Sequence, residues 1–155
     1  MKKRYEGFSL IEILVVVALI IILATITIVA INPAKNFKDT RDAQRSSDVN
    51  AILNAVTQFT SQDGNTPAAF GTISACDTDD WKAGTSIWDG KGTQPTGSAN
   101  LQGLVTGDFI VSIPRDPSEK TEGVSGYVIC TTPTGRVQIA APGVEGANKE
   151  IAVKR

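Results

Sequence analysis

The strongest constraint on this chain is a run of nineteen residues without a charge, from Ile13 to Ile31. As an α-helix this run is about 29 Å long, close to the thickness of the hydrocarbon core of a bilayer. Thr25 and Thr27 are compatible with such a helix, because a hydroxyl can donate to a carbonyl one turn back. A secretory signal peptide has a shorter apolar core, although the small residues of "ATITIVAINPAKN" leave that alternative open. The run therefore predicts a retained membrane span.

The charges before this run bear on orientation and on assembly. Lys2, Lys3 and Arg4 favour a cytoplasmic N-terminus with the rest of the chain outside. Glu12 lies at the edge of the run, and a carboxylate at the centre of a bilayer costs about 2.5–3.5 kcal/mol, less near an interface. One interpretation is that Glu12 reaches the interface or is protonated. The other is that it awaits a positive partner, which would be the α-amino group of a neighbouring chain if the short basic segment were removed.

The segment "KKRYEGFSLIEILVVVALIIIL" resembles the class III signal of type IV prepilins and type II secretion pseudopilins. The resemblance implies that a prepilin peptidase cuts between Gly7 and Phe8 on the cytoplasmic side and N-methylates Phe8. It further implies that Glu12 is the assembly carboxylate, which pairs with the Phe8 amine of an adjacent subunit.

The same resemblance implies a route from membrane to filament. The chain would first be a single-pass protein of the inner membrane, with its head outside the cytoplasm. An assembly platform in that membrane and an ATPase would then polymerise it into a helical homopolymer. The product would be an extracellular filament or a periplasmic pseudopilus.

One feature departs from the pattern of this family. Many type IV pilins have a helix-breaking proline within the apolar segment, where Val29 stands here or close to it. This chain has no proline before Pro33. Two alternatives follow: any local melting of the helix in the filament is shifted toward "AINPAKN", or Pro33 instead marks a kink where the helix leaves the membrane.

Residues 32–62 predict a second, amphipathic helical half, which could continue the first in one helix from Ser9 to Gln62. "QDGNTP" is expected to end it. Its upstream charges are expected to form a solvated face with weak local ion pairs. Those charges are Lys35, Lys38, Asp39, Arg41, Asp42 and Arg45. An apolar stripe at three- and four-residue spacing follows, made of Val49, Ile52, Leu53, Val56, Phe59 and Thr60.

The sequence of residues 63–155 predicts a small globular head. A long Gly-, Thr-, Ser- and Asp-rich loop comes first, with Trp81, Ile87 and Trp88 as buried candidates, and a short helix is expected around Asn100 to Val105. "YVICTT" and "RVQIAA" flank the turn "PTG" and predict an antiparallel hairpin, to which "KEIAV" adds a final strand. "IPRDP" resembles the Pro-Asp-Pro loop that precedes the sheet in many secretion pseudopilins, although a simple turn would also explain it.

The expected fold is therefore α+β and pilin-like. A long N-terminal α-helix, with a transmembrane half and an amphipathic half, packs on a small antiparallel β-sheet head. The predicted divisions are a leader at 1–7, a transmembrane and filament-core helix at 8–31, an amphipathic helix at 32–62 and the head at 63–155.

Composition argues against several kinds of chemistry. The chain has no histidine, which rules out Ser-His-Asp and Cys-His catalysis, and its two cysteines cannot form a zinc cage. No enzyme, cofactor or metal is therefore expected. Asp77, Asp79 and Asp80 lack the glycine and distal glutamate of an EF-hand loop, so they are interpreted as surface acidity rather than a calcium site. Lysine and arginine number 15 against 16 acidic residues, so no direct binding of nucleic acid is indicated.

Cys76 and Cys130 have two interpretations. If the region after the span lies outside the cytoplasm, a single disulfide between them is favoured. It would close a loop of more than fifty residues onto the hairpin. The alternative is a pair of buried apolar thiols.

Three functional hypotheses follow. The first is a structural subunit of a type IV pilus or pilus-like filament, with a type II secretion or competence pseudopilin, or a minor pilin, as its close alternative. The second is a membrane-anchored binding module that never polymerises and would bind carbohydrate through Trp81 and Trp88 if these side chains are exposed. The third is an enzyme, for which the sequence offers no nucleophile and base.

Overall fold

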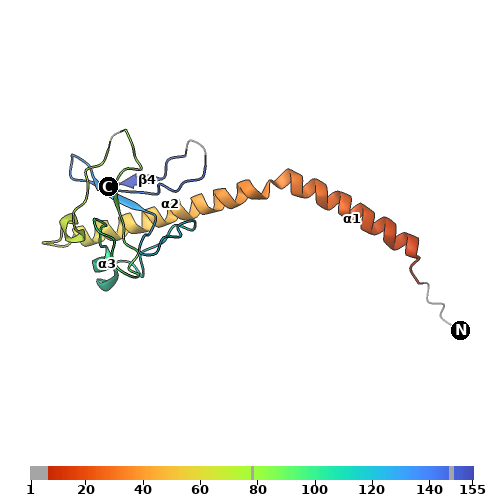
Figure 1. The fold of residues 1–155 in the computed structure, drawn as a ribbon, viewed down its shortest axis with the longest axis horizontal. Coiled ribbons are helices and arrows are strands. Elements are labelled where there is room, and N and C mark those ends of the chain that lie inside the picture. Colours follow the sequence, from red (N-terminus) through yellow and green to blue (C-terminus); the bar gives the residue numbers. More distant parts are fainter. Residues whose placement is uncertain (1–6, 78, 147–148) are drawn as a thin grey trace. The chain divides into compact units, whose positions relative to one another are not determined.

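The computed structural model describes residues 7–77, 79–146 and 149–155. The chain divides into two compact units, Met1–Phe37 and Lys38–Arg155. Figure 1 shows the ribbon coloured along the chain, from red at the N-terminus to blue at the C-terminus.

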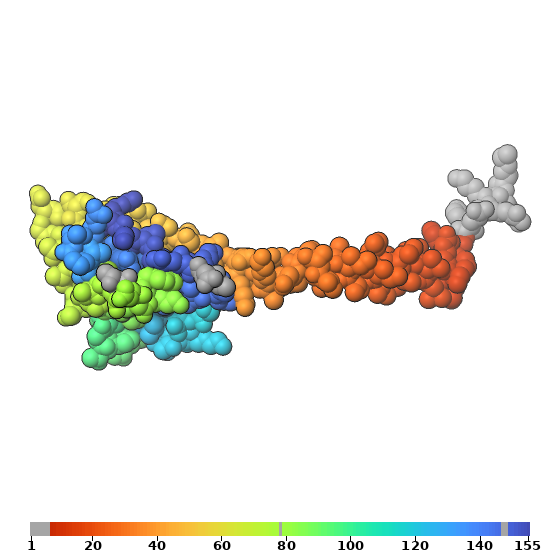
Figure 2. All heavy atoms as spheres, turned by 90° about the horizontal axis from the view of Figure 1, so that it is seen from above, coloured from red at the N-terminus to blue at the C-terminus, as the bar shows by residue number. Residues whose placement is uncertain are grey.

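The first unit is dominated by α1 (Leu10–Ile31), a helix of 22 residues with no buried residue. At 1.5 Å per residue it is about 33 Å long. Figure 2 shows it as a cylinder of side chains coloured red to orange. Among the described residues it is the one helix long and apolar enough to cross a membrane. Thr25 and Thr27 donate their hydroxyls to the carbonyls of Ile21 and Leu23, at 2.8 and 2.9 Å, as the sequence predicted.

The helix is interrupted at Asn32, so the two helical halves do not form one continuous helix. Asn32 adopts a left-handed conformation with φ 45° and ψ 74°. The next helix, α2 (Pro33–Thr60), begins with Pro33, whose missing N–H is not needed at a first helical position. The Oδ1 and carbonyl oxygens of Asn32 accept the backbone N–H of Lys35 at 3.3 and 3.1 Å, which caps α2. The interruption thus lies in "AINPAKN", where it was expected, and Val29 lies inside α1.

In the second unit, α2 forms one side of the core. The predicted apolar stripe is confirmed, because Val49, Ile52, Leu53 and Val56 are buried. Phe59 packs against the rings of Phe70 and Phe109, with centroids 5.1 and 5.7 Å away. The helix therefore belongs to the same hydrophobic core as the sheet.

The sheet has four antiparallel strands in the order β1-β2-β3-β4. They are β1 (Thr85–Ser86), β2 (Val128–Thr131), β3 (Val137–Ala140) and β4 (Ala152–Lys154). The predicted hairpin is the pair β2 and β3, and "KEIAV" supplies β4. Ile129 and Ile139 are paired across the hairpin and both are fully buried on the face that meets the core.

Shorter elements cover the rest of this core. A 3₁₀-helix, η1 (Pro67–Phe70), follows α2 and buries Phe70. The short helix α3 (Gln102–Thr106) lies close to its predicted position and buries Leu104. Of the three predicted buried side chains in the long loop, only Ile87 is fully buried. Trp81 and Trp88 are half-buried, which corrects that prediction. Taken together, the long apolar helix and the small antiparallel sheet confirm the α+β, pilin-like architecture.

Candidate functional site

The N-terminal junction lies where the chain enters α1. Ser9 has an extended backbone, and its carbonyl accepts the N–H of Glu12 and Ile13 at 3.0 and 3.3 Å. Glu12 is therefore in the first turn of the helix, where the helix dipole favours a negative charge. The Phe8 side chain is 78% exposed. Among the described residues Glu12 has no ion-pair partner, so this carboxylate is available to another molecule.

Gly7 precedes this turn, and the fold does not require a glycine there. A Cβ added to Gly7 would meet none of the described atoms within 4 Å. Its φ also lies outside the left-handed region that favours glycine. Lys2, Lys3 and Arg4, which the sequence assigns to the basic leader, lie outside the described residues.

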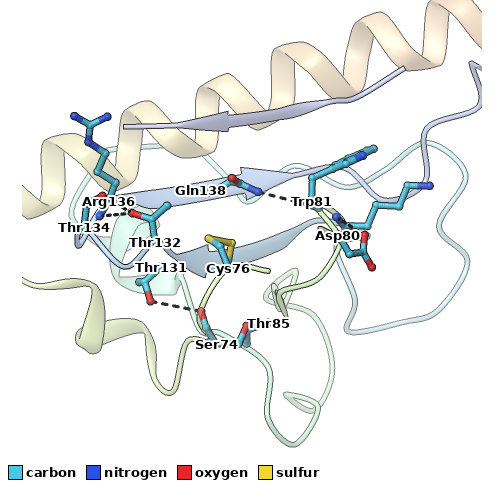
Figure 3. Close-up of a disulfide and its surroundings, with 12 residues drawn as sticks. Ser74, Cys76, Asp80, Trp81, Thr85, Thr131, Thr132, Thr134, Arg136 and Gln138 are labelled. Atoms are coloured by element: carbon cyan, nitrogen blue, oxygen red, sulfur yellow. Dashed lines mark hydrogen bonds between the residues drawn. A yellow bond between two sulfur atoms is a disulfide. The ribbon is translucent and has the colours of Figure 1, made fainter. Parts of the chain in front are cut away.

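The disulfide predicted between Cys76 and Cys130 is present. Cys130 is in β2, and Cys76 is in the loop that runs beside it (Figure 3). Two backbone hydrogen bonds hold the same loop, from the N–H of Cys76 to the Thr131 carbonyl at 2.9 Å and from the N–H of Thr131 to the Ser74 carbonyl at 3.0 Å. The bridge therefore covalently fastens the long loop to the centre of the sheet.

Arg45 is fully buried, and three carboxylates surround it. Its Nε and Nη2 donate to the two carboxylate oxygens of Asp116 at 2.6 and 2.9 Å. Its Nη1 donates to Asp42 at 2.8 Å, and Glu145 lies at 3.3 Å. Ser118 accepts a further hydrogen bond at 2.6 Å. All the donor nitrogens of the guanidinium thus have partners, as a buried charge requires.

This arrangement corrects the prediction of a solvated charged face on α2. Asp42 and Arg45 are both fully buried. The Asp42 carboxylate also accepts the backbone N–H of Glu145 and Gly146, at 3.1 and 2.9 Å. Arg41 forms a bidentate pair with Glu145 on the outer side. The charges of α2 therefore hold two distant loops, at Asp116 and at Glu145, against the helix.

The pKa values in this cluster follow from burial and from hydrogen bonding. Burial alone would raise the pKa of Asp116, but hydrogen bonds from Arg45 and Ser118 outweigh it and hold that pKa below its usual value. The pKa of Asp42 is likewise lowered, because backbone N–H groups and Arg45 outweigh its burial. The hydrogen bonds to Asp116 are the largest cause of the raised pKa of Arg45. All three groups are therefore charged at neutral pH.

The two tryptophans have different surroundings. The indole N–H of Trp88 donates to the Lys91 carbonyl at 2.9 Å, within its own loop. Trp81 lines a hollow of about 340 Å³ beside the disulfide. Its backbone carbonyl lies 3.5 Å from Nε2 of Gln138. The structure therefore separates two residues that the sequence grouped as one binding surface.

Two of the three predicted acidic side chains of this loop accept hydrogen bonds in its turns. Asp77 accepts the N–H of Asp79 at 2.9 Å, and Asp80 accepts the N–H of Lys82 at 3.0 Å. All three side chains are exposed. Within residues 7–77, 79–146 and 149–155, no group of three or more acidic, cysteine or histidine residues is placed to hold a metal ion.

Comparison with known families bears on the N-terminal junction. Residues 2–28 match the family model of the prokaryotic N-terminal methylation motif. This confirms the predicted class III prepilin signal and supports a place in the type IV pilin and pseudopilin family. The motif marks a type IV pilin-like or pseudopilin substrate of prepilin peptidase. Neither the curated proteins nor the solved structures give a match.

The sequence pointed to the junction and the disulfide but missed the cluster around Arg45. Asp116 is 71 residues from Arg45 and Glu145 is 100 residues away, so spacing could not bring them together. One signal was available, because Asp116 stands between two prolines in "IPRDP". The prolines hold this acidic residue in a rigid loop, and α2 carries an Asp and an Arg three residues apart. These two features are compatible with an ion pair between the loop and the helix.

Proposed function

We propose that this chain is a structural subunit of a type IV pilus or pilus-like filament. Prepilin peptidase cuts it between Gly7 and Phe8 and methylates the Phe8 amine. An inner-membrane assembly platform and an ATPase then move α1 from the membrane into the filament core. The head is outside the cytoplasm before assembly and on the surface of the filament, or of a periplasmic pseudopilus, after it.

The exposure of α1 is the observation that carries this proposal. All of its large apolar side chains are exposed, from 47% at Val16 to 79% at Leu10. Water is a poor solvent for such a surface, so lipid or other apolar helices must cover it. A filament core made of many copies of this helix supplies that cover, and a membrane supplies it before assembly.

Glu12 then has a specific partner in the filament. Cleavage after Gly7 would create a positive α-amino group on Phe8, four residues before Glu12. In a core of apolar helices the carboxylate and the amine would each be costly alone, and pairing between neighbouring subunits removes both costs. The pair would also fix the axial register of the subunits. The position of Glu12 in the first turn, without a partner among the described residues, supports this role.

The glycine at position 7 supports cleavage there. Because neither space nor backbone conformation demands a glycine, the fold does not account for it. A peptidase that binds the chain in an extended form does account for it, since a side chain at this position would enter its active site.

Two alternative functions differ from this proposal in assembly. A secretion or competence pseudopilin, or a minor pilin, shares the same N-terminal chemistry and differs in the machine that it serves. A membrane-anchored module that never polymerises would not need Glu12. Catalysis is not part of this proposal, because the sequence lacks histidine and shows no paired nucleophile and base.

The test is a substitution at Glu12 in cells that produce the filament. Glu12→Ala and Glu12→Val are expected to be cut and membrane-inserted as the wild type is, yet to yield at least about tenfold fewer filaments, a loss equivalent to 1.4 kcal/mol. Ile20→Leu in the same helix is the control and is expected to assemble normally. Sheared filaments and membrane fractions are quantified by immunoblot. A normal filament yield from both Glu12 variants would refute the pairing.

A further inference from the structure

The sheet has an outward face that the core does not use. Side chains alternate along each strand, so residues paired across neighbouring strands share a face. Ile129, Ile139 and Val153 are in register and belong to the core or pack against it. The adjacent row points the other way and consists of Cys130, Gln138 and Lys154.

A hollow of about 340 Å³ lies on this outward face. Gln138 and Lys154 contribute to its lining from β3 and β4, and Cys76, Asp77 and Trp81 contribute a wall. Figure 3 shows Trp81 near one end of this region and Arg136 near the other, with the disulfide and Gln138 between them. The volume is at the lower end of the range typical of small-molecule sites.

Both ends of the hollow are held in place by bonds within the chain. The disulfide fastens the loop that carries Trp81, and Gln138 holds the Trp81 carbonyl. At the other end the Thr132 hydroxyl accepts the N–H of Arg136 at 3.0 Å and lies 2.9 Å from the Thr134 hydroxyl. A ligand would therefore meet a largely ordered site, which lowers the entropy cost of binding.

The lining combines one aromatic ring with balanced polar groups. Trp81 offers an indole ring, with the Nζ of Lys82 5.4 Å from its centroid, and Gln138 has both a donor and an acceptor. Arg136 and Lys154 add two positive charges, whereas Asp77 and Glu150 add two negative charges. A charged ligand would meet like charges together with opposite ones, so this lining favours a neutral molecule with many hydroxyls.

We propose that this hollow binds the terminal sugars of a neutral glycan. A sugar ring has an apolar face that packs on an aromatic side chain, and its hydroxyls both donate and accept hydrogen bonds. Trp81 supplies the first contact, and Gln138, Glu150 and Lys154 supply the second. Every residue involved belongs to the second unit, so binding can be measured on the unassembled chain.

The test uses the full chain in a detergent without a sugar headgroup, so that no detergent competes. Saturation-transfer NMR is run with lactose, cellobiose and N,N′-diacetylchitobiose at millimolar concentration. Sialyllactose and glucosamine are the charged comparators. At least one neutral disaccharide is expected to receive saturation, and to bind more tightly than either charged sugar.

Trp88 provides a matched control, since it is half-buried like Trp81 but does not line the hollow. Trp81→Leu is expected to weaken binding at least about tenfold, which corresponds to 1.4 kcal/mol, and Trp88→Leu to leave it unchanged. Retention of the disulfide and of the far-UV circular dichroism shows that each variant is folded. If Trp81→Leu does not fold, Glu150→Ala at an exposed position replaces it, with an expected loss of at least threefold.

Three outcomes would overturn the proposal. The first is that none of the neutral disaccharides receives saturation from the wild-type chain. The second is that a charged sugar binds more tightly than all of them. The third is that the folded Trp81 variant, or Glu150→Ala in its place, binds as the wild type does.

Discussion

Arg45 is the buried charge on which the loops of the second unit converge. It joins α2 to Asp116 and Glu145, and Asp42 beside it accepts two backbone N–H groups from the second loop. Gly143 makes room for this packing, because a Cβ there would lie 2.8 Å from Oδ2 of Asp116. The cluster therefore acts as a polar core next to the apolar one.

Removing the guanidinium should destabilise the second unit severely. In Arg45→Ala the carboxylates of Asp42 and Asp116 would remain buried without their partner, which costs about 3–5 kcal/mol. Arg136→Ala removes an exposed arginine and is the matched control, with an expected change within about 0.5 kcal/mol. Urea unfolding of the full chain in detergent, followed by tryptophan fluorescence, measures both. Equal midpoints for the two variants would show that the cluster contributes no stability.

Single residues differ in how far sequence could predict them. Glu12, Gly7 and Phe8 form a local motif, so the prepilin signal could be identified from neighbours in the chain. The environment of Arg45 depends on loops 71 and 100 residues away, and a charge on a helix is more often solvated than buried. The half-burial of Trp81 and Trp88 depends in the same way on how the long loop folds over the sheet.

The position of the long loop depends on its covalent link to β2. The described part of residues 71–84 contains no helix or strand, and a single β-bridge, from Ala75 to Thr131, joins it to β2. Cys76 and Cys130 are 54 residues apart, so the bridge restricts a large part of the unfolded chain. On the chain-entropy model this contributes about 4 kcal/mol.

Replacing both cysteines by serine should therefore lower the free energy of unfolding by about 4 kcal/mol. The loop would also become the first site of proteolysis, because its backbone would lose its main attachment. Limited proteolysis with mass spectrometry locates the cuts, and urea unfolding gives the energy. Ser46→Ala and Ser61→Ala in a double variant provide a control at exposed positions of comparable size. An unchanged midpoint and no new cut in the loop would contradict this account.

The elements themselves were largely predictable. The apolar run, the amphipathic stripe and the strand–turn–strand pattern around "PTG" are periodic signals, and all three gave the observed elements. The interruption at Asn32 was expected only as a kink at Pro33, because a proline restricts its predecessor without fixing the conformation it takes. The two-residue strand β1 and the 3₁₀-helix η1 are too short to carry a periodic signal.

The stability of the whole molecule should depend on pH in two opposite ways. The lowered pKa values of Asp42 and Asp116 mean that their contribution is complete above their ordinary value of 3.8 and is lost as pH falls through the folded values. Burial, with the hydrogen bond to Asp48, raises the pKa of the Tyr127 hydroxyl above its ordinary value of 10.0. The contribution of the Tyr127 hydroxyl to the free energy of unfolding is therefore present below pH 10.0 and is lost as pH rises further.

A plateau of stability is thus expected from about pH 5 to about pH 9, with unfolding beyond each edge. Thermal melting of the full chain between pH 2 and pH 11 measures the profile. Tyr127→Phe should reduce the alkaline loss and leave the acid edge in place. A maximum confined to acid pH would contradict the assignment of Asp42 and Asp116 as buried, charged groups.

The central claim is that α1 leaves the membrane to become the core of a filament after the leader is removed. The most direct measurement is mass spectrometry of the subunit in sheared surface filaments that have first been identified by electron microscopy. The account predicts a subunit that begins with N-methylated Phe8, and a Gly7→Glu variant that retains its leader and yields no filaments. Filaments that lack this chain, or a chain that stays in the membrane with residues 1–7 attached, would contradict it.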